Sequence, residues 1–307
     1  MGIVVIGTTF VDVKGYPFGE YVPTGRNAGR VIEVHGGVAR NIAEDIANVG
    51  LAPTLVSMVD ESQLSDDLVS RLARCGCDTS YVGRAEGGLG MWLAIFDETG
   101  DVAGSISRRP DTSGIERILI NWGDEIISQA ESVCIDLDID APILERVLDL
   151  ALQHGKKVYS PVTNIAIACE RRNLLDKVSC LVCNQQESGV LFSSELGSAS
   201  PDEMRAALPG ELARIGLRSA MVTMGAQGSV FAQMDGKSGW CPAHVVEVVD
   251  TTGAGDAFFA GVAIGLSDGK SLEESCSIGA RLAASTIASE ENVCGRFSPE
   301  EFGLTTR

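Results

Sequence analysis

The sequence is poor in aromatic residues and in positive charge. Phe, Trp and Tyr make up 5% of the 307 residues, and 24 Lys and Arg residues stand against 42 Asp and Glu residues, which gives a formal net charge of −18. A surface of this sign repels polyanions, so binding to nucleic acid or to an anionic membrane is not expected. A small anionic ligand is still compatible, because a local pocket of backbone amides overrides the global field.

The sequence also lacks a long apolar run and a start that resembles a signal peptide. No stretch reaches the length needed to span a bilayer, and residues 1–7 contain no basic region. The nine cysteines are odd in number and scattered along the chain, which favours reduced thiols over a disulfide framework. We therefore expect a cytoplasmic protein with no membrane partner.

A zinc or redox site is the other function that cysteines can indicate. Cys180 and Cys183 have the required spacing, but they lie in an apolar run, and no second pair or suitable histidine follows them. Buried core thiols are therefore the better interpretation of this pair.

What the sequence does contain is a regular alternation of short apolar runs and amphipathic stretches. Hydrophobic residues make up 45% of the chain, which is enough for a sizeable core. Strands that alternate with helices predict an α/β fold with a mostly parallel sheet covered on both faces. The expected strands are residues 2–7, 53–59, 132–136, 157–160, 179–184 and 219–223, and the clearest helices are residues 37–49, 64–75 and 141–153.

Two segments interrupt this alternation. Residues 10–34 are rich in glycine and proline with short β-like runs, and residues 81–106 contain two strand-like runs around the turn at residues 97–100. Both have the pattern of antiparallel excursions from the core, and we expect them to pair into a small second sheet that covers a site. No repeat or linker divides the chain, so residues 1–307 are expected to form one domain with this small sheet as its lid.

The strongest motif is the run Asp-Thr-Thr-Gly-Ala-Gly-Asp at residues 250–256. It follows a strand-like run, residues 245–249, and opens an apolar helix, residues 257–266, which must be buried because it is hydrophobic on all sides. The start of such a helix carries unpaired N–H groups and a partial positive charge. Because glycines let those amides approach a ligand closely, the motif predicts an anion site for a phosphate or a transferring phosphoryl group.

Asp256 lies at the start of the same helix. The positive end of a helix favours the charged form of a carboxyl group, so we expect Asp256 to stay ionised and to accept the proton of an attacking hydroxyl. The simpler alternative is that Asp256 only caps the helix and that the glycines only form a turn.

At residues 250–256 the sequence resembles the ribokinase-like (PfkB) family of sugar kinases, whose signature contains Asp-Thr-x-Gly-Ala-Gly-Asp. The resemblance extends over essentially the whole chain, from Val4 to about Phe302. It implies a ribokinase-like three-layer sandwich with a small β lid. It also implies an enzyme that uses ATP and Mg²⁺, with K⁺ in many relatives, to phosphorylate a hydroxyl group of a small sugar or nucleoside.

The resemblance gives the residues of this motif their roles. Asp256 would be the catalytic base, and the amides of Gly253, Ala254 and Gly255 would hold the charge that develops during direct in-line transfer. The two β excursions would close over the site and exclude water, which otherwise competes as an acceptor.

Two further motifs of the family appear in the expected order on the sugar side. Residues 35–43 resemble the N-terminal Gly-Gly signature, in which Gly36 and Gly37 bring the backbone against the sugar and Asn41 binds its hydroxyl groups. Asp12 carries over as a second sugar ligand, a role that suits a carboxylate because it accepts bonds from two vicinal hydroxyls. Without the resemblance, residues 35–43 would be a plain helix start and Asp12 a lone turn residue.

Two motifs match the family on the nucleotide side. Asn184 and Glu187 form its Asn-x-x-Glu motif, in which Asn184 supports the nucleotide phosphates and Glu187 holds Mg²⁺ through water. Without the resemblance this pair would be an ordinary helix N-cap. Thr223, Gly225 and Gly228 resemble the phosphate loop of the family, and no Gly-Lys-Ser/Thr follows them, so they are not a Walker A loop. These loops follow the carboxyl ends of predicted strands, where open α/β sheets bind ligands.

The resemblance also implies a site for a monovalent cation and a possible association of subunits. Asp250 and Thr252 lie where the relatives that bind K⁺ take ligands for that ion, so a cation site is implied there. Lids in this family often pair between subunits, and a homodimer through the lid is therefore an expectation.

Within the family the sequence most resembles the pseudouridine kinases, in residues 11–17, 36–44 and 288–293. That similarity implies transfer of the γ-phosphoryl group of ATP to the 5′-hydroxyl of pseudouridine. Residues 24–29 and 107–111 depart from this branch, and both lie in segments expected to cover the base.

Other functions stay open at this point. The acceptor could be ribose, another sugar or another nucleoside, or a hydroxymethylpyrimidine. A phosphosugar would require extra cationic groups near the sugar, for which Arg26, Arg40, Arg108 and Arg109 are candidates. A catalytically silent sugar- or nucleoside-binding protein would keep the fold, but it would be expected to lose the base or the Gly-Ala-Gly loop, and both are present.

Overall fold

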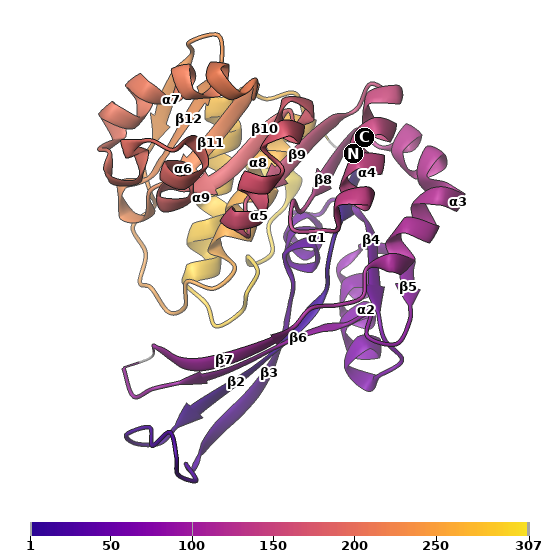
Figure 1. Ribbon diagram of the computed structural model, residues 1–307, viewed down its shortest axis with the longest axis vertical. Helices are drawn as coiled ribbons and strands as arrows, with labels where there is room; N and C mark the ends of the chain where they lie inside the picture. Colours follow the sequence, from indigo (N-terminus) through magenta and orange to yellow (C-terminus); the bar gives the residue numbers. More distant parts are fainter. Residues whose placement is uncertain (1, 100, 306–307) are drawn as a thin grey trace.

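The computed structural model describes residues 2–99 and 101–305, which form two β-sheets (Figure 1). The larger sheet has nine strands in the order β13-β12-β11-β10-β9-β8-β1-β4-β5, parallel except for the two strands at the β13 edge. Its strands are β1 (Ile3–Ile6), β4 (Thr54–Val59), β5 (Asp78–Arg84), β8 (Ser132–Ile135), β9 (Lys157–Pro161), β10 (Cys180–Asn184), β11 (Ser219–Thr223), β12 (Ser229–Gln233) and β13 (Ser238–Cys241).

Helices cover both faces of the large sheet. Successive strand residues point to opposite faces, so Val4 and Ile6 of β1 pack in one core, and Ile3 and Val5 pack in the other. The first core is covered by α3 (Ser113–Gln129), α4 (Ala141–Gln153), α5 (Ile165–Glu170), α6 (Gln185–Phe192) and α7 (Pro201–Ile215), and the second by α1 (Val38–Asn48), α2 (Gln63–Cys75), α8 (Ala254–Ser267) and α9 (Leu272–Ile287). The predicted three-layer α/β sandwich is confirmed.

Local signals in the sequence set the ends of several helices. The side chain of Ser62 accepts a hydrogen bond from the Ser65 amide at the start of α2, and Gly76 ends the helix with a φ of 101°. Ser200 caps α7 in the same way, and Gly216 ends it in the left-handed region. Short 3₁₀ helices occupy Arg172–Lys177, Glu195–Ser198, Gly225–Gln227 and Pro299–Phe302.

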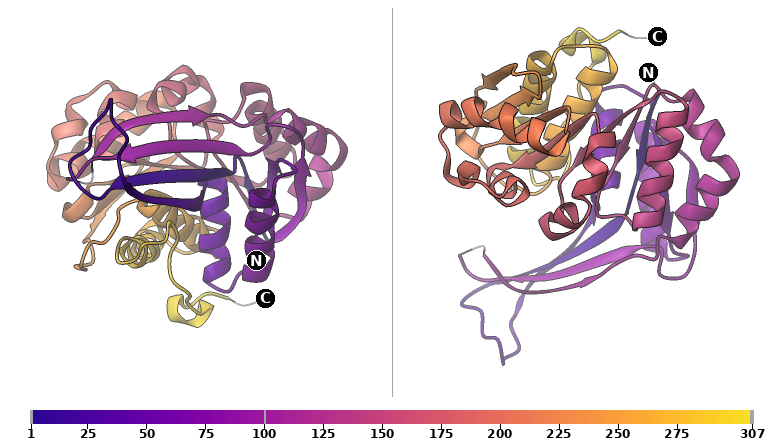
Figure 2. Two further views of the ribbon diagram at one scale, coloured as in Figure 1. Left: turned by 90° about the horizontal axis from the view of Figure 1, so that it is seen from below. Right: turned by 45° about the horizontal axis from the view of Figure 1, so that its top comes forward.

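The small sheet has the order β3-β2-β6-β7 and extends away from the body of the molecule (Figures 1 and 2). It consists of β2 (Phe10–Pro17), β3 (Gly29–Gly36), β6 (Gly90–Phe96) and β7 (Val102–Arg108). The predicted second sheet is therefore present, built from the two segments that interrupt the alternation. Gly100, at the end of the predicted turn at residues 97–100, lies outside the described residues.

Two details of this sheet differ from the prediction. The strands β2 and β6 pair in parallel, whereas only antiparallel pairing was expected. The reason is that β2 and β6 follow the parallel strands β1 and β5 by short connections, and both therefore leave the large sheet in the same direction. In addition, Tyr81 to Arg84 belong to β5 of the large sheet, so the second lid segment begins near Gly90 instead of Tyr81.

Cys180 and Cys183 are buried in β10, in agreement with their interpretation as core thiols, and each of the nine cysteines has a free thiol.

Within residues 2–99 and 101–305, none of the helices combines the length and the apolarity required to cross a bilayer.

Candidate active site

The candidate site lies where the carboxyl ends of the parallel strands meet the small sheet (Figure 2). Asn184 ends β10 beside Thr223, which ends β11, and Asp136 directly follows β8. The helix α8 begins with Ala254 and packs closely against α1. This edge therefore collects residues from motifs that are far apart in the sequence, as the strand-end rule predicts.

The loop before α8 is shaped by Gly253. This residue is the N-cap with a φ of 80°, and a side chain on it would meet the carbonyl oxygen of Asn292 at 2.0 Å. None of the described side chains caps the helix. The Ala254 amide donates to the carbonyl oxygen of Thr251 at 3.3 Å, so the amides of Gly253 and Gly255 are the ones that remain available to a ligand. A side chain on Gly255 would meet no protein atom within 4 Å, which shows that the space beside this amide is open. These features match an anion site at the start of α8.

The strand predicted just before this loop is wrong. Residues 245–249 form an irregular, largely exposed segment after β13, with Val248 and Val249 59% and 54% exposed. Val249 donates one backbone hydrogen bond to Ile287, and none of the described strands pairs with the segment. β-branched residues favour a strand only when a neighbouring strand supplies the hydrogen bonds.

Asp256 points toward α1, where Nδ2 of Asn41 donates a hydrogen bond to its Oδ2 at 2.7 Å. Burial raises the pKa of Asp256 to about 7, and the bond from Asn41 opposes that rise; the carboxylates of Asp136 and Asp12 raise the pKa further, whereas Arg40 lowers it. This pKa differs from the expectation that the helix start keeps the carboxyl group fully ionised, because burial is the largest influence on it. Such a group can exchange a proton near neutral pH.

Asp12, Gly36 and Gly37 lie together beside this carboxyl group. A side chain on Gly36 would meet Oδ2 of Asp12 at 2.6 Å, so only glycine lets the Asp12 carboxylate occupy this position. Gly37 has a φ of 95°, and a side chain there would meet the backbone of Phe10 at 2.7 Å. Burial raises the pKa of Asp12, and Lys14 and Arg40 lower it. The predicted sugar-side residues are therefore brought together around Asp256.

The face of the small sheet that carries Asp12 also carries Lys14 and an aromatic cluster. Strand register places Trp92 directly beside Asp12, and residues two apart along a strand share one face. Tyr16 stacks on Phe96 with ring centroids 4.7 Å apart, and Trp92 meets Phe96 edge-on at 6.5 Å. Because Nζ of Lys14 on this face lies 3.6 Å from Oδ2 of Asp250 in the loop before α8, the aromatic face is turned toward the site.

An apolar cavity of ≈ 510 Å³ lies on the other side of the α8 start. It is lined by the predicted phosphate-loop residues Thr223, Gly225 and Gly228 and by Val246, Phe258 and Ala283. Gly255 and Thr251 also line it, so the cavity opens onto the loop that carries the anion site. Asn184 and Glu187 do not line this cavity, although the β10–β11 register pairs Asn184 with Thr223.

Asn184 and Glu187 form a capping box at the start of α6. Oδ1 of Asn184 accepts a hydrogen bond from the Glu187 amide, and Oε2 of Glu187 accepts one from the Asn184 amide, each at 2.8 Å. Burial raises the pKa of Glu187, and the bond from Asn184 lowers it. Oε1 of Glu187 accepts no hydrogen bond within the described chain, so it has the free oxygen that a water-bridged Mg²⁺ site needs.

Three of the four arginines considered for a phosphosugar are bound within the chain: Arg40 to Asn41, Arg108 to the carbonyl oxygen of Leu89 and Arg109 to Asp138. Arg40 is buried against Glu44, and Nη2 of Arg109 lies 2.8 Å from Oδ1 of Asp138. The carboxyl groups of Asp12 and Asp136 lie close enough to influence that of Asp256, and the negative charge of these groups would repel a second phosphate.

Lys14 and Asp136 lie at the site but were not predicted from the sequence, and Arg40, which bonds to Asn41, was considered only as a contact for a phosphosugar. Asp136 is buried, accepts hydrogen bonds from Thr163 and from the amide of Asp138, and has a pKa raised to about 6, chiefly by burial. Its place directly after a parallel strand was a usable signal. Arg40 and Lys14 carried no such signal, since charged residues usually point to solvent.

Comparisons with known proteins show the family of the chain and relatives of the same fold. Residues 2–293 match the pfkB family carbohydrate kinases. The guanosine-inosine kinase of Exiguobacterium acetylicum is 32% identical over 292 residues, 94% of this chain and 95% of that protein, and the pseudouridine kinase of Escherichia coli is 28% identical over 89% and 86%. The Arabidopsis thaliana ribokinase complexed with ribose and ATP superposes with a TM-score of 0.81 at 21% identity, covering 96% of each chain.

Proposed function

Since the chain belongs to the pfkB family of carbohydrate kinases, and is on that ground a phosphotransferase that acts on a sugar or nucleoside, we propose that it transfers the γ-phosphoryl group of ATP to the 5′-hydroxyl of a ribonucleoside. Guanosine and inosine are the first candidate acceptors and pseudouridine is the next. The names of the two similar nucleoside kinases support this order, because the guanosine-inosine kinase is more identical and more fully covered than the pseudouridine kinase.

One observation supports a nucleoside over a free sugar. The lid presents Tyr16, Trp92 and Phe96 on the face that also carries Asp12. A ribose held between Asp12 and Asp256 would direct its base toward this face, and aromatic rings stack on the π-face of any base. A free pentose has no base that could stack on these rings. The base-stacking role is the part of the proposal that separates this chain from a plain sugar kinase.

The donor nucleotide is assigned to the apolar cavity beside α8. Val246, Phe258 and Ala283 offer an apolar slot for adenine, and the open space beside Gly225 leaves room for phosphates. The amides of Gly253 and Gly255 at the start of α8 would then face the γ-phosphoryl group. Acceptor and donor would meet at the loop formed by Gly253, Ala254 and Gly255.

In this arrangement Asp256 acts as the catalytic base. Its Oδ1 accepts no hydrogen bond from any described residue and is free to receive the proton of the attacking hydroxyl, while Asn41 holds Oδ2. The amides near Gly255 hold the charge that develops on the transferred group. Mg²⁺ bound with ATP would neutralise charge on the phosphate oxygens, and the free oxygen of Glu187 suits a water-bridged contact with it.

A potassium ion fits this site less well. Asp250 and Thr252 supply carboxylate and hydroxyl oxygens, but Oδ1 of Asp250 already accepts two hydrogen bonds from Thr252, and its Oδ2 lies 3.6 Å from Nζ of the buried Lys14. A second cation next to the same oxygen would be repelled by the ammonium group. No step of the reaction is assigned to K⁺.

The outer face of the small sheet suits a subunit contact. Val31, Leu93 and Ile106 are 69%, 40% and 71% exposed on the face opposite Asp12. Exposed apolar residues grouped on a sheet are typical of an interaction surface. A homodimer through the lid remains part of the proposal, as does a place in the cytoplasm, which the nine free thiols support.

The proposal is tested by ADP release with Mg-ATP and a panel of acceptors: guanosine, inosine, adenosine, uridine, pseudouridine and ribose. We expect kcat/KM for the preferred nucleoside to exceed that for ribose by roughly 10–100-fold, which is the contribution of one base–aromatic stacking contact. Trp92→Ala should reduce this preference without changing turnover of ribose. Leu93→Ala, on the opposite face of the same strand, is the matched control. A wild-type enzyme that favours ribose would refute the nucleoside assignment.

A further inference from the structure

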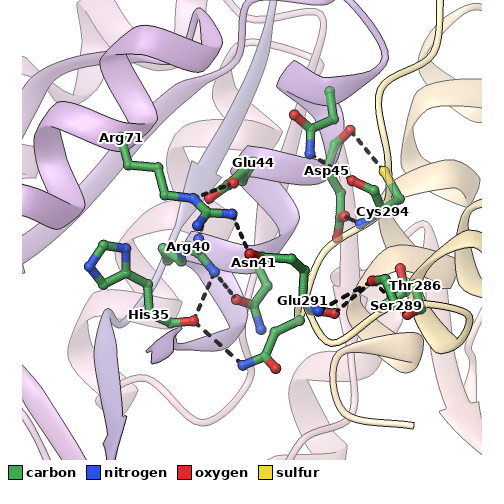
Figure 3. Close-up of polar contacts among 12 residues, drawn as sticks. His35, Arg40, Asn41, Glu44, Asp45, Arg71, Thr286, Ser289, Glu291 and Cys294 are labelled. Atoms are coloured by element: carbon green, nitrogen blue, oxygen red, sulfur yellow. Dashed lines mark hydrogen bonds and ion pairs between the residues drawn. The ribbon is translucent and has the colours of Figure 1, made fainter. Parts of the chain in front are cut away.

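We propose that Arg40 is a positioning residue for the catalytic base and acts on it through Asn41, an inference that rests on the proposed function. Nη1 of Arg40 donates hydrogen bonds to Oδ1 of Asn41 at 2.8 Å and to the carbonyl oxygen of His35 at 2.9 Å (Figure 3). Nδ2 of Asn41 in turn donates to Asp256 at 2.7 Å. Two consecutive hydrogen bonds therefore connect a buried guanidinium group to the base.

The first of these bonds fixes which way the Asn41 amide faces. A guanidinium group only donates hydrogen bonds, so the Asn41 atom next to Arg40 must be the oxygen. The NH₂ group is then forced to face Asp256, where it stabilises the carboxylate. Without Arg40 the amide could turn over and place its oxygen against the carboxylate. That orientation would repel the ionised base.

Arg40 is itself held by a row of alternating charges. Its Nη2 pairs with Glu44, whose other oxygen accepts a hydrogen bond from Nε of Arg71 at 2.7 Å. Nη2 of Arg71 then donates to Glu291 at 2.8 Å (Figure 3). Arg40 and Glu44 are 2% and 1% exposed. The row crosses from α1 to α2 and to the segment after α9, so three parts of the chain hold the guanidinium group in place.

The segment after α9 also shapes the catalytic loop. Oδ1 of Asp45 accepts a hydrogen bond from the amide of Cys294 at 2.7 Å, and Nδ2 of Asn48 donates one to the carbonyl oxygen of Cys294 at 2.8 Å. The carbonyl oxygen of Asn292 lies where a side chain on Gly253 would be. The helix α1 therefore holds both the base, through Asn41, and the backbone next to the anion site.

A purely structural role is a poor explanation for this arrangement. Buried ion pairs contribute little net stability, because desolvation of the two charges offsets their attraction, and an apolar side chain of the same size would fill the space. The carboxylates of Asp12 on β2 and Asp136 after β8 raise the pKa of Asp256. Asp256 in turn raises the pKa of the buried Asp45 of α1. Arg40 supplies a positive charge among them.

The test compares Arg40→Met with wild-type protein over a range of pH. A base must be ionised to act, so wild-type kcat/KM should rise with pH through about 7, the pKa of Asp256. Loss of the cation favours the protonated form, and the midpoint should move up by roughly one pH unit. At pH 7 kcat/KM should fall roughly five- to tenfold and largely recover near pH 9, with KM for ATP unchanged.

A second measurement does not depend on turnover. In protein labelled with ¹³C at the aspartate carboxyl groups, the Asp256 signal is identified by its absence in Asp256→Asn, and its pKa should rise in Arg40→Met. If no acceptor is turned over by wild-type protein, the proposed function fails, yet this titration still decides whether Arg40 acts on Asp256. Should Arg40→Met not fold, Arg40→Lys, which keeps the charge but not both hydrogen bonds, should shift the midpoint in the same direction by a smaller amount.

Arg71→Met is the matched control, since it breaks two ion pairs of the same row and leaves the bond between Arg40 and Asn41 in place. We expect it to lower thermal stability without moving the pH midpoint. The proposal is overturned if Arg40→Met and Arg71→Met lose stability alike and both keep the wild-type midpoint and the wild-type pKa of Asp256.

Discussion

Replacement of Asp256 by asparagine should lower kcat by about 10²–10⁴-fold and leave the binding of ATP nearly unchanged. The reason is that an amide cannot accept the proton of the attacking hydroxyl, whereas the amides at the start of α8 and the apolar nucleotide cavity are untouched. Oδ1 of the new asparagine would still accept the hydrogen bond from Asn41 that Oδ2 of Asp256 accepts now. Steady-state kinetics and calorimetry with ATP measure the two effects separately.

The same variant gives a check on folding. Burial raises the pKa of Asp256, so its ionised form destabilises the folded state, and the stability that the protonated form provides is lost as the pH rises from about 4 toward about 7. The uncharged asparagine removes this penalty. Asp256→Asn should therefore unfold at or above the wild-type temperature at pH 8. A variant with near-normal turnover would refute the assignment of the base.

Replacement of Gly253 by alanine should lower kcat roughly 10²-fold. The added methyl group would lie 2.0 Å from the carbonyl oxygen of Asn292, and a φ of 80° is unfavourable for alanine. The loop must move to relieve both, and a displacement of about 1 Å at catalytic groups is enough for a loss of this size. Steady-state kinetics with saturating ATP and acceptor measures the loss.

Gly269→Ala is the matched control for backbone strain. Gly269 follows the other end of α8 with a φ of 81°, and a side chain there would meet no atom within 4 Å. This variant carries the conformational cost of about 1 kcal/mol without a clash near the site. It should unfold slightly earlier and keep wild-type kcat. Equal loss of activity in both variants would show that strain in α8, and not the position of the loop, limits the reaction.

The fold was largely predictable because its elements depend on local patterns. The helix predicted at residues 141–153 coincides with α4, whose apolar residues repeat on one face, and the strand predicted at residues 219–223 coincides with β11. The small sheet was located from its turns and strand-like runs. The pairing of β2 with β6 was not predictable from either strand, since it follows from the direction in which β1 and β5 enter the lid.

Elsewhere the sequence pattern was misleading, because the β propensity of a segment does not show whether a partner strand lies beside it. Residues 245–249 have the composition of a strand, but β13 ends the large sheet and leaves them without a partner strand. The pKa of Asp256 depends on burial between α1 and α8 and on carboxylates from distant segments, none of which a helix-start motif reveals.

The site was predictable only where a motif carries its chemistry. Asp12, Gly36, Gly37 and Asn41 meet beside Asp256, as the motifs implied, and Asn41 donates a hydrogen bond to Asp256 in addition to its proposed contact with the sugar. Arg40 is hidden in the same motif as an ordinary helical charge. Its burial against Glu44, Arg71 and Asn41 becomes visible only when α1, α2 and the segment after α9 are packed together.

The most direct test of the central claim is ³¹P NMR of the products formed from Mg-ATP with inosine and, in parallel, with 5′-deoxyinosine. Transfer to the 5′-hydroxyl predicts ADP and inosine 5′-monophosphate in equal amounts from inosine and neither product from 5′-deoxyinosine. Guanosine and pseudouridine with their 5′-deoxy analogues extend the same comparison to the other candidate acceptors. Equal ADP formation from each nucleoside and its 5′-deoxy analogue would contradict the claim.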